Sequence, residues 1–222
     1  MNIDIIVQAR MGSKRLPGKV LKPIMGRPMI EYTLESMRRC RNVRGIVSAV
    51  PTGDHELIKV CGRYGAVWTG PEKNVAARFM GAVRSRRPDA FVRICGDSPV
   101  IDGRMVADYV NIMLAGDYNL VFNVGGGFPH GQQMEIVGAE FFLANKSRLD
   151  REHVTPPLYA LTRKKHMIAL DYPSTDPSLV VDTQEDFDRV SCVIERAGGK
   201  PWEYDWRQLQ DFAREPCLNQ SN

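Results

Sequence analysis

The sequence predicts an α/β fold in which helices cover both faces of a mostly parallel sheet. The chain has 222 residues, of which 43% are hydrophobic, and this suits a single globular domain. Over roughly the first 120 residues, short apolar runs alternate with longer stretches of helical periodicity. Such alternation is typical of a parallel sheet that is buried on both sides.

The predicted elements follow in order from the N-terminus. Residues 3–7 form an apolar run that suits a buried strand, and Pro28 begins a helical stretch, where proline is well tolerated. Asp54 is placed to act as the N-cap of the next helix. The same patterns predict strands at 45–50, 66–68, 90–95 and 120–123, and helices at 28–40, 54–64, 75–86 and 103–114.

After residue 123 the pattern becomes less regular. A strand is predicted at 134–137, a short helix at 139–147 and a strand at 166–170. Pro156 and Pro157 disfavour a continuous helix across residues 150–165. A helix at 183–196 closes the fold, and the polar tail from Pro216 is expected to fray. We expect one domain, 1–222, in which residues 125–172 form an arm over the active site, a dimer contact, or both.

The loop that follows the first strand carries the strongest chemical signal. Residues 8–20 read QARMGSKRLPGKV and contain two glycines, a serine and the cations Arg10, Lys14, Arg15 and Lys19. Glycine lets the backbone approach a ligand closely, and N–H groups and cations neutralise phosphate oxygens. The loop is interpreted either as a polyphosphate site or as a solvated basic turn.

Two aspartates at the ends of apolar runs suit a metal ion bound to phosphate. Asp97 follows the strand predicted at 90–95, and Asp182 directly precedes the last predicted helix. Magnesium prefers one or two carboxylates together with phosphate oxygens, so the pair predicts a metal site at the strand ends. In the alternative, structural interpretation, Asp97 belongs to a turn with Ser98 and Pro99, and Asp182 is an N-cap.

Glu135 and His153 are further candidates. Glu135 lies in an apolar run, so its carboxylate is expected to point inward and to need a partner. It either binds an acceptor hydroxyl, orients a metal-bound water or pairs with an arginine. His153, close to Arg151, either holds an anionic acceptor or is structural.

Several function classes are excluded or disfavoured. The sequence has no GxSxG, HExxH, GxxxxGK[ST] or GxGxxG motif, and its five cysteines form no CxxC pair. Cys95 is interpreted as a small core residue. The net charge of +4 is too modest to indicate nucleic acid, and no apolar run approaches the ~20 residues of a membrane span. No secretion signal is evident, and the odd cysteine count suits a reducing cytoplasm, so a cytoplasmic location is expected.

Five segments of the chain, taken together, resemble a known family. IVQARMGSKRLPGKVL is similar to the N-terminal signature of the CMP-sugar synthetases, the acylneuraminate and 3-deoxy-manno-octulosonate cytidylyltransferases. The resemblance continues through ICGDSPVID, FPHGQQMEIV, REHVTP and VVDTQEDF, and it is strongest to the branch named after spore-coat polysaccharide synthesis. It implies a three-layer nucleotidyltransferase fold, similar to GT-A glycosyltransferases, with an inserted dimerisation and acceptor arm. Homodimers are implied as well.

The resemblance also implies a reaction and a set of site residues. CMP would pass from CTP to a small acidic acceptor, a 2-keto-3-deoxy sugar acid, with release of pyrophosphate and with Mg²⁺ as cofactor. The nucleotide would be bound by Ala9, Arg10, Gly12, Ser13, Arg15, Lys19, Arg78 and Asp97, of which Arg10, Lys19 and Asp97 would be catalytic. Asp97 and Asp182 would bind the metal, and Gln133, Glu135, Arg151 and His153 would bind the acceptor.

One position departs from the family pattern. Related sequences of this branch usually read GLDVE, whereas residues 131–135 here read GQQME, so that Gln133 replaces an aspartate. A neutral amide at the acceptor would tolerate a more anionic substrate, which keeps a phosphonate or phosphate acceptor open as an alternative. Less favoured are a glycosyltransferase, whose DxD motif would be Asp186–Asp188 inside a predicted helix, and a non-catalytic nucleotide-binding module.

Overall fold

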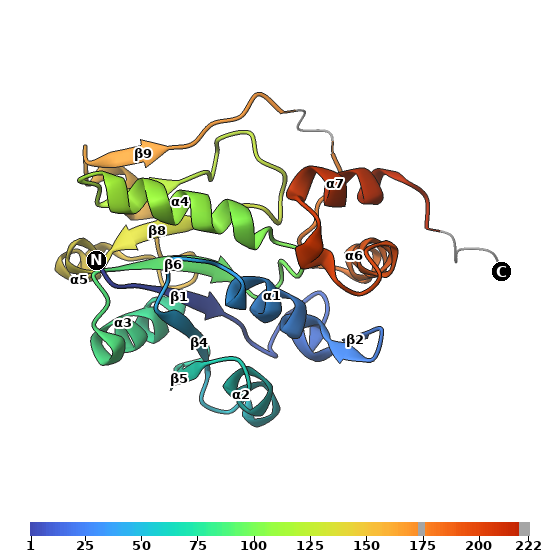
Figure 1. The fold of residues 1–222 in the computed structure, drawn as a ribbon. Helices are drawn as coiled ribbons and strands as arrows, with labels where there is room; N and C mark the ends of the chain where they lie inside the picture. Colours follow the sequence, from blue (N-terminus) through green and yellow to red (C-terminus); the bar gives the residue numbers. More distant parts are fainter. Residues whose placement is uncertain (173–175, 218–222) are drawn as a thin grey trace.

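A seven-stranded sheet forms the centre of the protein (Figure 1), whose computed structural model describes residues 1–172 and 176–217. The strand order is β5-β4-β1-β6-β8-β7-β9. β8 runs antiparallel to both of its neighbours, while the other adjacent pairs are parallel, which confirms the predicted mostly parallel sheet. The strands are β1 (Ile3–Gln8), β4 (Gly45–Pro51), β5 (Ala66–Gly70), β6 (Ala90–Cys95), β7 (Leu120–Phe122), β8 (Glu135–Gly138) and β9 (Lys165–Met167).

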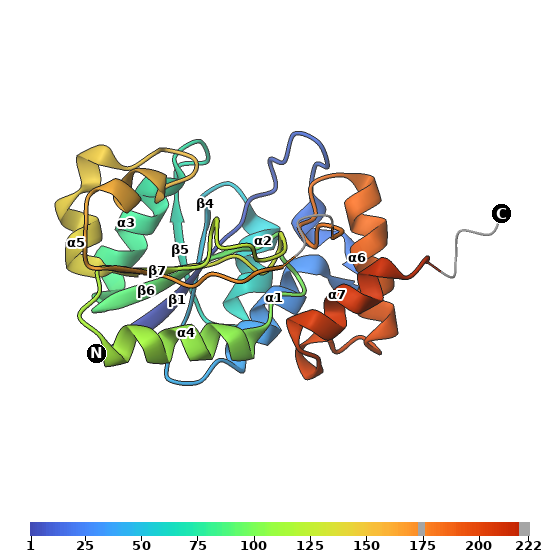
Figure 2. The ribbon, with the colours of Figure 1, turned by 90° about the horizontal axis from the view of Figure 1, so that it is seen from above.

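Helices cover both faces of this sheet. Figure 2 shows α3 and α5 on one side and α4 on the other. A two-stranded hairpin, β2 (Pro23–Ile24) with β3 (Arg27–Pro28), stands outside the sheet. The α-helices are α1 (Met29–Arg38), α2 (His55–Gly62), α3 (Val75–Arg86), α4 (Gly103–Ala115), α5 (Ala139–Ala144), α6 (Gln184–Arg196) and α7 (Trp206–Arg214). The 3₁₀ turns are η1 (Lys19–Leu21), η2 (Lys146–Arg148), η3 (Pro156–Ala160) and η4 (Pro201–Glu203).

The two faces of the sheet bury separate cores. Because side chains alternate along a strand, Ile5 packs on the side of α1 and α4, whereas Ile6 packs on the side of α3 and α5. Phe91 joins Ile6 on the second side, between Phe79 of α3 and Phe142 of α5. Burial on both faces explains why the strands read as nearly continuous apolar runs.

Most predicted elements are confirmed, with bounds that shift by a few residues. The predicted apolar face of α4 is buried along its length, from Met105 to Met113. Asp54 stands at the N-cap position of α2, but its side chain makes no capping hydrogen bond. Its Oδ2 instead accepts a hydrogen bond of 2.8 Å from the backbone N–H of Met11, because the loop after β1 lies beside it. The capping role predicted for Asp54 is therefore wrong in this detail.

The middle block is less separate than expected. β8 and β9 of residues 125–172 belong to the central sheet, and β8 lies between β6 and β7. Register pairs Arg93 of β6 directly with Glu135 of β8. The predicted arm therefore supplies part of the sheet as well as the irregular segment between α5 and β9.

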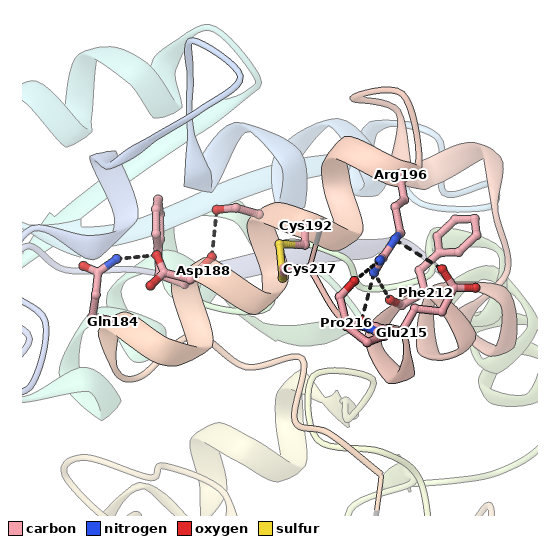
Figure 3. The surroundings of a disulfide bond; sticks show 10 residues. Gln184, Asp188, Cys192, Arg196, Phe212, Glu215, Pro216 and Cys217 are labelled. Carbon is pink, nitrogen blue, oxygen red and sulfur yellow. Dashed lines mark hydrogen bonds and ion pairs between the residues drawn. A yellow bond between two sulfur atoms is a disulfide. The ribbon is translucent and has the colours of Figure 1, made fainter. Parts of the chain in front are cut away.

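The C-terminal region lies beyond the carboxyl ends of β1 and β6 (Figure 1). It contains α7, which was not predicted and which packs against α6. Cys192 of α6 and Cys217 form a disulfide, with Arg196 beside it bonding the main-chain carbonyls of Phe212 and Glu215 (Figure 3). The sequence interpretation, a reducing compartment, did not include this bond. Residues 218–222, part of the tail expected to fray, lie outside the described residues.

Candidate active site

The loop between β1 and η1 is held in a defined shape at the carboxyl end of β1. The carbonyl of Met11 accepts hydrogen bonds from the N–H groups of Ser13 and Gly18, at 2.9 and 3.0 Å. Gly18 has a φ of 71°, a left-handed conformation that favours glycine. Together with the hydrogen bond that the Met11 N–H donates to Asp54, these contacts fix the loop without using its cationic side chains.

The cationic side chains of this loop line a cavity of about 420 Å³, which we call the loop cavity. It contains the predicted nucleotide residues except Gly12, which instead packs against Glu72. It also contains the predicted metal ligand Asp182. The lining residues are Gln8, Ala9, Arg10, Ser13, Lys14, Arg15, Lys19, Val20, Val75, Arg78, Arg93, Cys95, Asp97, Glu152, His153 and Asp182.

Lys19 connects the two aspartates at the centre of the loop cavity. Its Nζ donates to Asp97 Oδ2 at 2.9 Å, to Asp182 Oδ1 at 3.0 Å and to the Val181 carbonyl at 2.6 Å. Arg15 binds the other oxygen of Asp182 at 2.8 Å. Asp182 is not the N-cap of α6, because Thr183 takes that position and forms a capping box with Asp186. The alternative interpretation of Asp182 as a cap is therefore wrong.

A close backbone approach brings Asp97 to the loop. The N–H of Gly96 donates to the carbonyl of Gln8 at 2.8 Å. A side chain at residue 96 would place its Cβ 2.5 Å from Ile30 Cδ1 and 3.0 Å from the Cβ of Ala9. Glycine is required here because no Cβ fits between β6, β1 and α1.

Arg78 lies in the loop cavity wall but is almost wholly buried. Its Nη1 donates to the carbonyls of Pro71 and Glu72, at 2.6 and 2.8 Å, and its Nε to that of Ala49. Burial lowers the pKa of this guanidinium to about 10. Its bonds to backbone carbonyls show that it shapes the cavity by holding residues 71–72 against the end of β4.

A second cavity of about 340 Å³, which we call the sheet cavity, lies over β6 and β8. Of the predicted acceptor residues, it contains Gln133, Glu135 and His153. Arg151 is not among the residues lining either cavity; it is exposed, and its carbonyl accepts the N–H of Val75. The lining residues are Arg93, Cys95, Asp97, Ser98, Val124, Gly131, Gln133, Met134, Glu135, His153, Thr155, Pro156, Tyr159 and Val180.

Glu135 is the centre of a buried polar network in the sheet cavity. Its Oε2 accepts from Arg93 Nη1 at 2.6 Å, and its Oε1 accepts from the hydroxyls of Thr155, at 2.6 Å, and Tyr159. Arg93 Nε also donates to Gln8 Oε1 at 3.2 Å. Burial, reinforced by the Glu135 carboxylate, raises the pKa of the Tyr159 phenol. Of the three roles open to Glu135, pairing with an arginine is the one that the structure shows.

The sequence interpretation missed Arg93 and Cys95 as site residues. A cation inside the apolar run of β6 was a visible signal, since a charge in such a run needs a partner. Cys95 was interpreted as a core residue, but it lies on the same face of β6 as Arg93 and lines both cavities. Thr155 and Tyr159 carried no signal of their own, because only the fold brings them to Glu135.

The donor set around Lys19 fits a magnesium ion. Within the described residues, no group of three or more histidine, cysteine or acidic side chains is arranged to hold a metal. Asp97 and Asp182 nevertheless converge on a single ammonium group, so their carboxylates lie within a few ångströms of each other. Two carboxylates completed by phosphate oxygens suit magnesium, a hard cation that keeps few protein ligands.

The sequence of this chain is similar to that of known cytidylyltransferases and of a polysaccharide biosynthesis protein. A family model described as cytidylyltransferase matches residues 5–165. The chain is 29% identical to the spore coat polysaccharide biosynthesis protein SpsF of Bacillus subtilis, over 90% of this chain and 89% of that protein.

Solved structures show the same fold. A cytidylyltransferase from Leptospira borgpetersenii is similar with a TM-score of 0.89 and 23% identity, over 100% of this chain and 99% of that one. A CMP:2-keto-3-deoxy-manno-octonic acid synthetase complexed with CTP is similar with a TM-score of 0.71 and 16% identity, over 89% and 100%. These likenesses confirm the α/β fold with its mostly parallel sheet. Among the described helices, none has both the length and the apolar character that a bilayer crossing requires.

Proposed function

Because the chain belongs to the cytidylyltransferase family, we propose that it transfers CMP from CTP to a 2-keto-3-deoxy sugar acid with release of pyrophosphate. The observation that carries this proposal is the loop cavity, where Lys19 joins Asp97 and Asp182 beneath a loop with three further cations. A triphosphate needs such a surface, because its charge must be neutralised both in binding and as pyrophosphate leaves.

The chain's own residues have distinct tasks in this proposal. Arg10, Lys14 and Arg15 line the open side of the loop cavity and bind the β- and γ-phosphates. Lys19, whose side chain is only 8% exposed, lies deeper and stabilises charge near the α-phosphorus. Most of the rate enhancement then comes from position and electrostatics.

Magnesium is the proposed cofactor, with Asp97 and Asp182 as its protein ligands. When bound, the ion supplies positive charge to the phosphate oxygens and the leaving group. Lys19 and Arg15, which hold the two aspartates in the structure, keep these carboxylates oriented toward the cavity. Activity with magnesium is therefore compared with activity after EDTA has chelated the metal ion.

The acceptor is assigned from the sheet cavity. Hydroxyl and amide groups of Ser98, Gln133, Thr155 and Tyr159 line it, and Arg93 is its one arginine or lysine. A polyhydroxylated acceptor suits this lining, because hydroxyl and amide groups predominate and Arg93 is already paired with Glu135. The two similar proteins named above, one a spore coat polysaccharide biosynthesis protein and one a CMP:2-keto-3-deoxy-manno-octonic acid synthetase, support a sugar acid for polysaccharide synthesis.

A second candidate keeps the reaction and changes the acceptor. Gln133 lines the sheet cavity where related sequences usually carry an aspartate, so one negative charge is removed beside the acceptor. Less repulsion would admit a phosphonate or phosphate group. Here the same enzyme would cytidylylate a phosphonate-bearing metabolite of specialised metabolism.

A homodimer is proposed as the active assembly. β9 is the edge strand of the sheet, and the nearby side chains of Leu161 and Met167 are 38% and 52% exposed. An uncovered edge with apolar side chains suits pairing with a second copy. Light scattering at several concentrations tests this: a mass of twice 25.0 kDa supports the dimer, and a monomer contradicts it.

Pyrophosphate release is the decisive assay. The enzyme is incubated with CTP, magnesium and, in turn, 3-deoxy-2-ulosonic acids, nonulosonic acids and small phosphonates, with EDTA-treated controls. Release with a sugar acid supports the first candidate, and release with phosphonates alone supports the second. If no acceptor gives magnesium-dependent release, the proposed function is overturned.

A further inference from the structure

The loop cavity and the sheet cavity share part of one wall. Four residues line both: Arg93 and Cys95 of β6, Asp97 after it, and His153. If nucleotide and acceptor occupy the two cavities, as the proposed function requires, the α-phosphorus and the attacking acceptor oxygen meet at this wall. The chemistry of four side chains therefore decides what happens to the acceptor's proton.

Three of the four shared residues are poorly suited to accept a proton. Arg93 carries a guanidinium, which stays protonated and has no acceptor nitrogen. The thiol of Cys95 is a weak hydrogen-bond acceptor and a poor partner for a hydroxyl proton. The carboxylate of Asp97 is bonded to Lys19 and belongs to the proposed metal site.

His153 has the chemistry that the others lack. A neutral imidazole has a nitrogen lone pair that can accept a proton from a ligand. The side chain is exposed toward the cavities, and no hydrogen bond occupies its imidazole among residues 1–172 and 176–217. It is therefore available to a ligand that spans the shared wall.

The backbone around His153 is held unusually firmly. Asp150 Oδ1 accepts the N–H groups of Glu152 and His153, at 2.9 and 2.6 Å. Val154, directly after the histidine, is buried and has a φ of 67°, which is strained for a β-branched residue. Such conformations persist only where the surroundings impose them, and they cluster at active sites.

The network of Glu135 provides part of this restraint. Glu135 Oε1 accepts from Thr155 Oγ1 at 2.6 Å, two residues after His153, and from the hydroxyl of Tyr159. Glu135 itself is fixed by Arg93 across the β6–β8 pair. The turn that carries His153 is thus anchored to the central sheet through a buried carboxylate.

We infer that His153 is the general base of the reaction and that the acceptor reacts through a hydroxyl group. The acceptor's O–H bond breaks as its oxygen bonds to the α-phosphorus, and the proton passes to the imidazole of His153. The bond from the α-phosphorus to the oxygen bridging to the β-phosphate breaks, and its electron pair leaves with pyrophosphate. A fully ionised phosphonate would need no such base, so this inference, which rests on the proposed function, favours the sugar acid.

The test is chemical rescue of His153→Ala. We expect kcat for the hydroxyl acceptor to fall by about 10²-fold or more. We expect the KM for CTP to change little, since His153→Ala keeps every arginine, lysine and carboxylate that lines the loop cavity. Added imidazole should restore part of kcat, and at constant total imidazole the rescue should follow the concentration of its unprotonated form. A merely structural histidine would show no such dependence.

The matched control is His55→Ala, an exposed histidine that lines neither cavity, which should keep wild-type kinetics. CTP binding by calorimetry tests whether His153→Ala remains folded, and we expect an affinity close to that of the wild type. If the wild type turns over a hydroxyl acceptor and His153→Ala is equally active, this inference alone is overturned. The same holds if His153→Ala is inactive and imidazole does not rescue it. Turnover restricted to phosphonates also overturns it while leaving cytidylyl transfer intact, and no turnover with any acceptor overturns the proposed function together with it.

Discussion

The two cavities hold their charged groups in different ways. In the loop cavity, Lys19 bonds to Asp97 and Asp182, whose side chains are 29% and 39% exposed. In the sheet cavity, Arg93 and Glu135 are 14% and 3% exposed and are completed by hydroxyl groups. The first set of ion pairs is open to water and to ligands, whereas the second is closed.

This difference in exposure indicates that the charged groups around Lys19 serve ligand binding, whereas the Arg93–Glu135 pair serves the stability of the fold. Because the carboxylates of Asp97 and Asp182 stay partly solvated, they can change partners when a ligand enters the loop cavity. A buried pair strongly destabilises the fold when one partner is removed, because the other charge is left without compensation. We therefore expect substitutions in the loop cavity to change activity and substitutions in the buried pair to change stability.

The largest expected effect is on activity, at Asp97. Asp97→Asn removes one charge from the proposed metal site and should lower kcat for pyrophosphate release by about 10³-fold. Because the carboxylate is partly exposed, the melting temperature should stay close to that of the wild type. Pyrophosphate assays and thermal unfolding measure the two quantities. Normal activity would refute the metal assignment.

The next largest effect is on stability, at Arg93. Arg93→Met leaves Glu135 buried without its cation and should reduce the free energy of unfolding by about 3–5 kcal/mol. The double variant Arg93→Met with Glu135→Met should recover part of this loss, as measured by urea denaturation. Lys19→Met is the matched comparison in the loop cavity and should cost less than Arg93→Met, because the carboxylates it leaves behind, Asp97 and Asp182, are 29% and 39% exposed and stay partly solvated. Equal losses for Arg93→Met and Lys19→Met would remove the distinction between the cavities.

The shared wall should give a smaller, pH-dependent effect through Cys95. Burial raises the pKa of this thiol from 9.0 to about 11, so unfolding releases its proton more readily as the pH rises. The contribution of the protonated Cys95 thiol to the free energy of unfolding is fully present below pH 9 and is lost as the pH rises toward 11. Between pH 8 and 10, the wild type should lose about 1 kcal/mol more stability than Cys95→Ala, measured by urea denaturation. Parallel pH profiles of the two proteins would contradict the buried thiol.

The smallest effect on activity is expected at Gln133. Gln133→Asp adds a charge to the sheet cavity, so it should shift the ratio of kcat/KM between phosphonate and carboxylate acceptors by about 10-fold, or 1.4 kcal/mol. Stability and the KM for CTP should not change. Arg151→Ala, which lines neither cavity, is the control and should keep the wild-type acceptor profile. Identical profiles for wild type and Gln133→Asp would show that this residue does not select the acceptor.

Local patterns predicted the loop side of the molecule well. α3 and β6 have the bounds predicted from their apolar periodicity, and the loop of Arg10, Arg15 and Lys19 lies beside Asp97 as expected for neighbouring strand ends. These features depend on short stretches of sequence and on one topological rule.

The sheet cavity could not be derived in the same way. Arg93 and Glu135 lie 42 residues apart and meet only through the register of two antiparallel strands. α7 was not predicted, although Asp205 and Gln208 form a capping box whose residue types are visible in the sequence. The pairing of Cys192 with Cys217 cannot be chosen from cysteine positions alone.

The lining of the loop cavity also affects how fast a nucleotide arrives. Its cations outnumber its carboxylates: Arg10, Lys14, Arg15, Lys19, Arg78 and Arg93 stand against Asp97, Glu152 and Asp182. Such a field attracts a polyanion before contact, and salt screens it over about 10 Å at 0.1 M ionic strength. The association rate constant of CTP should therefore decrease with ionic strength, while its dissociation, governed by direct contacts, changes far less.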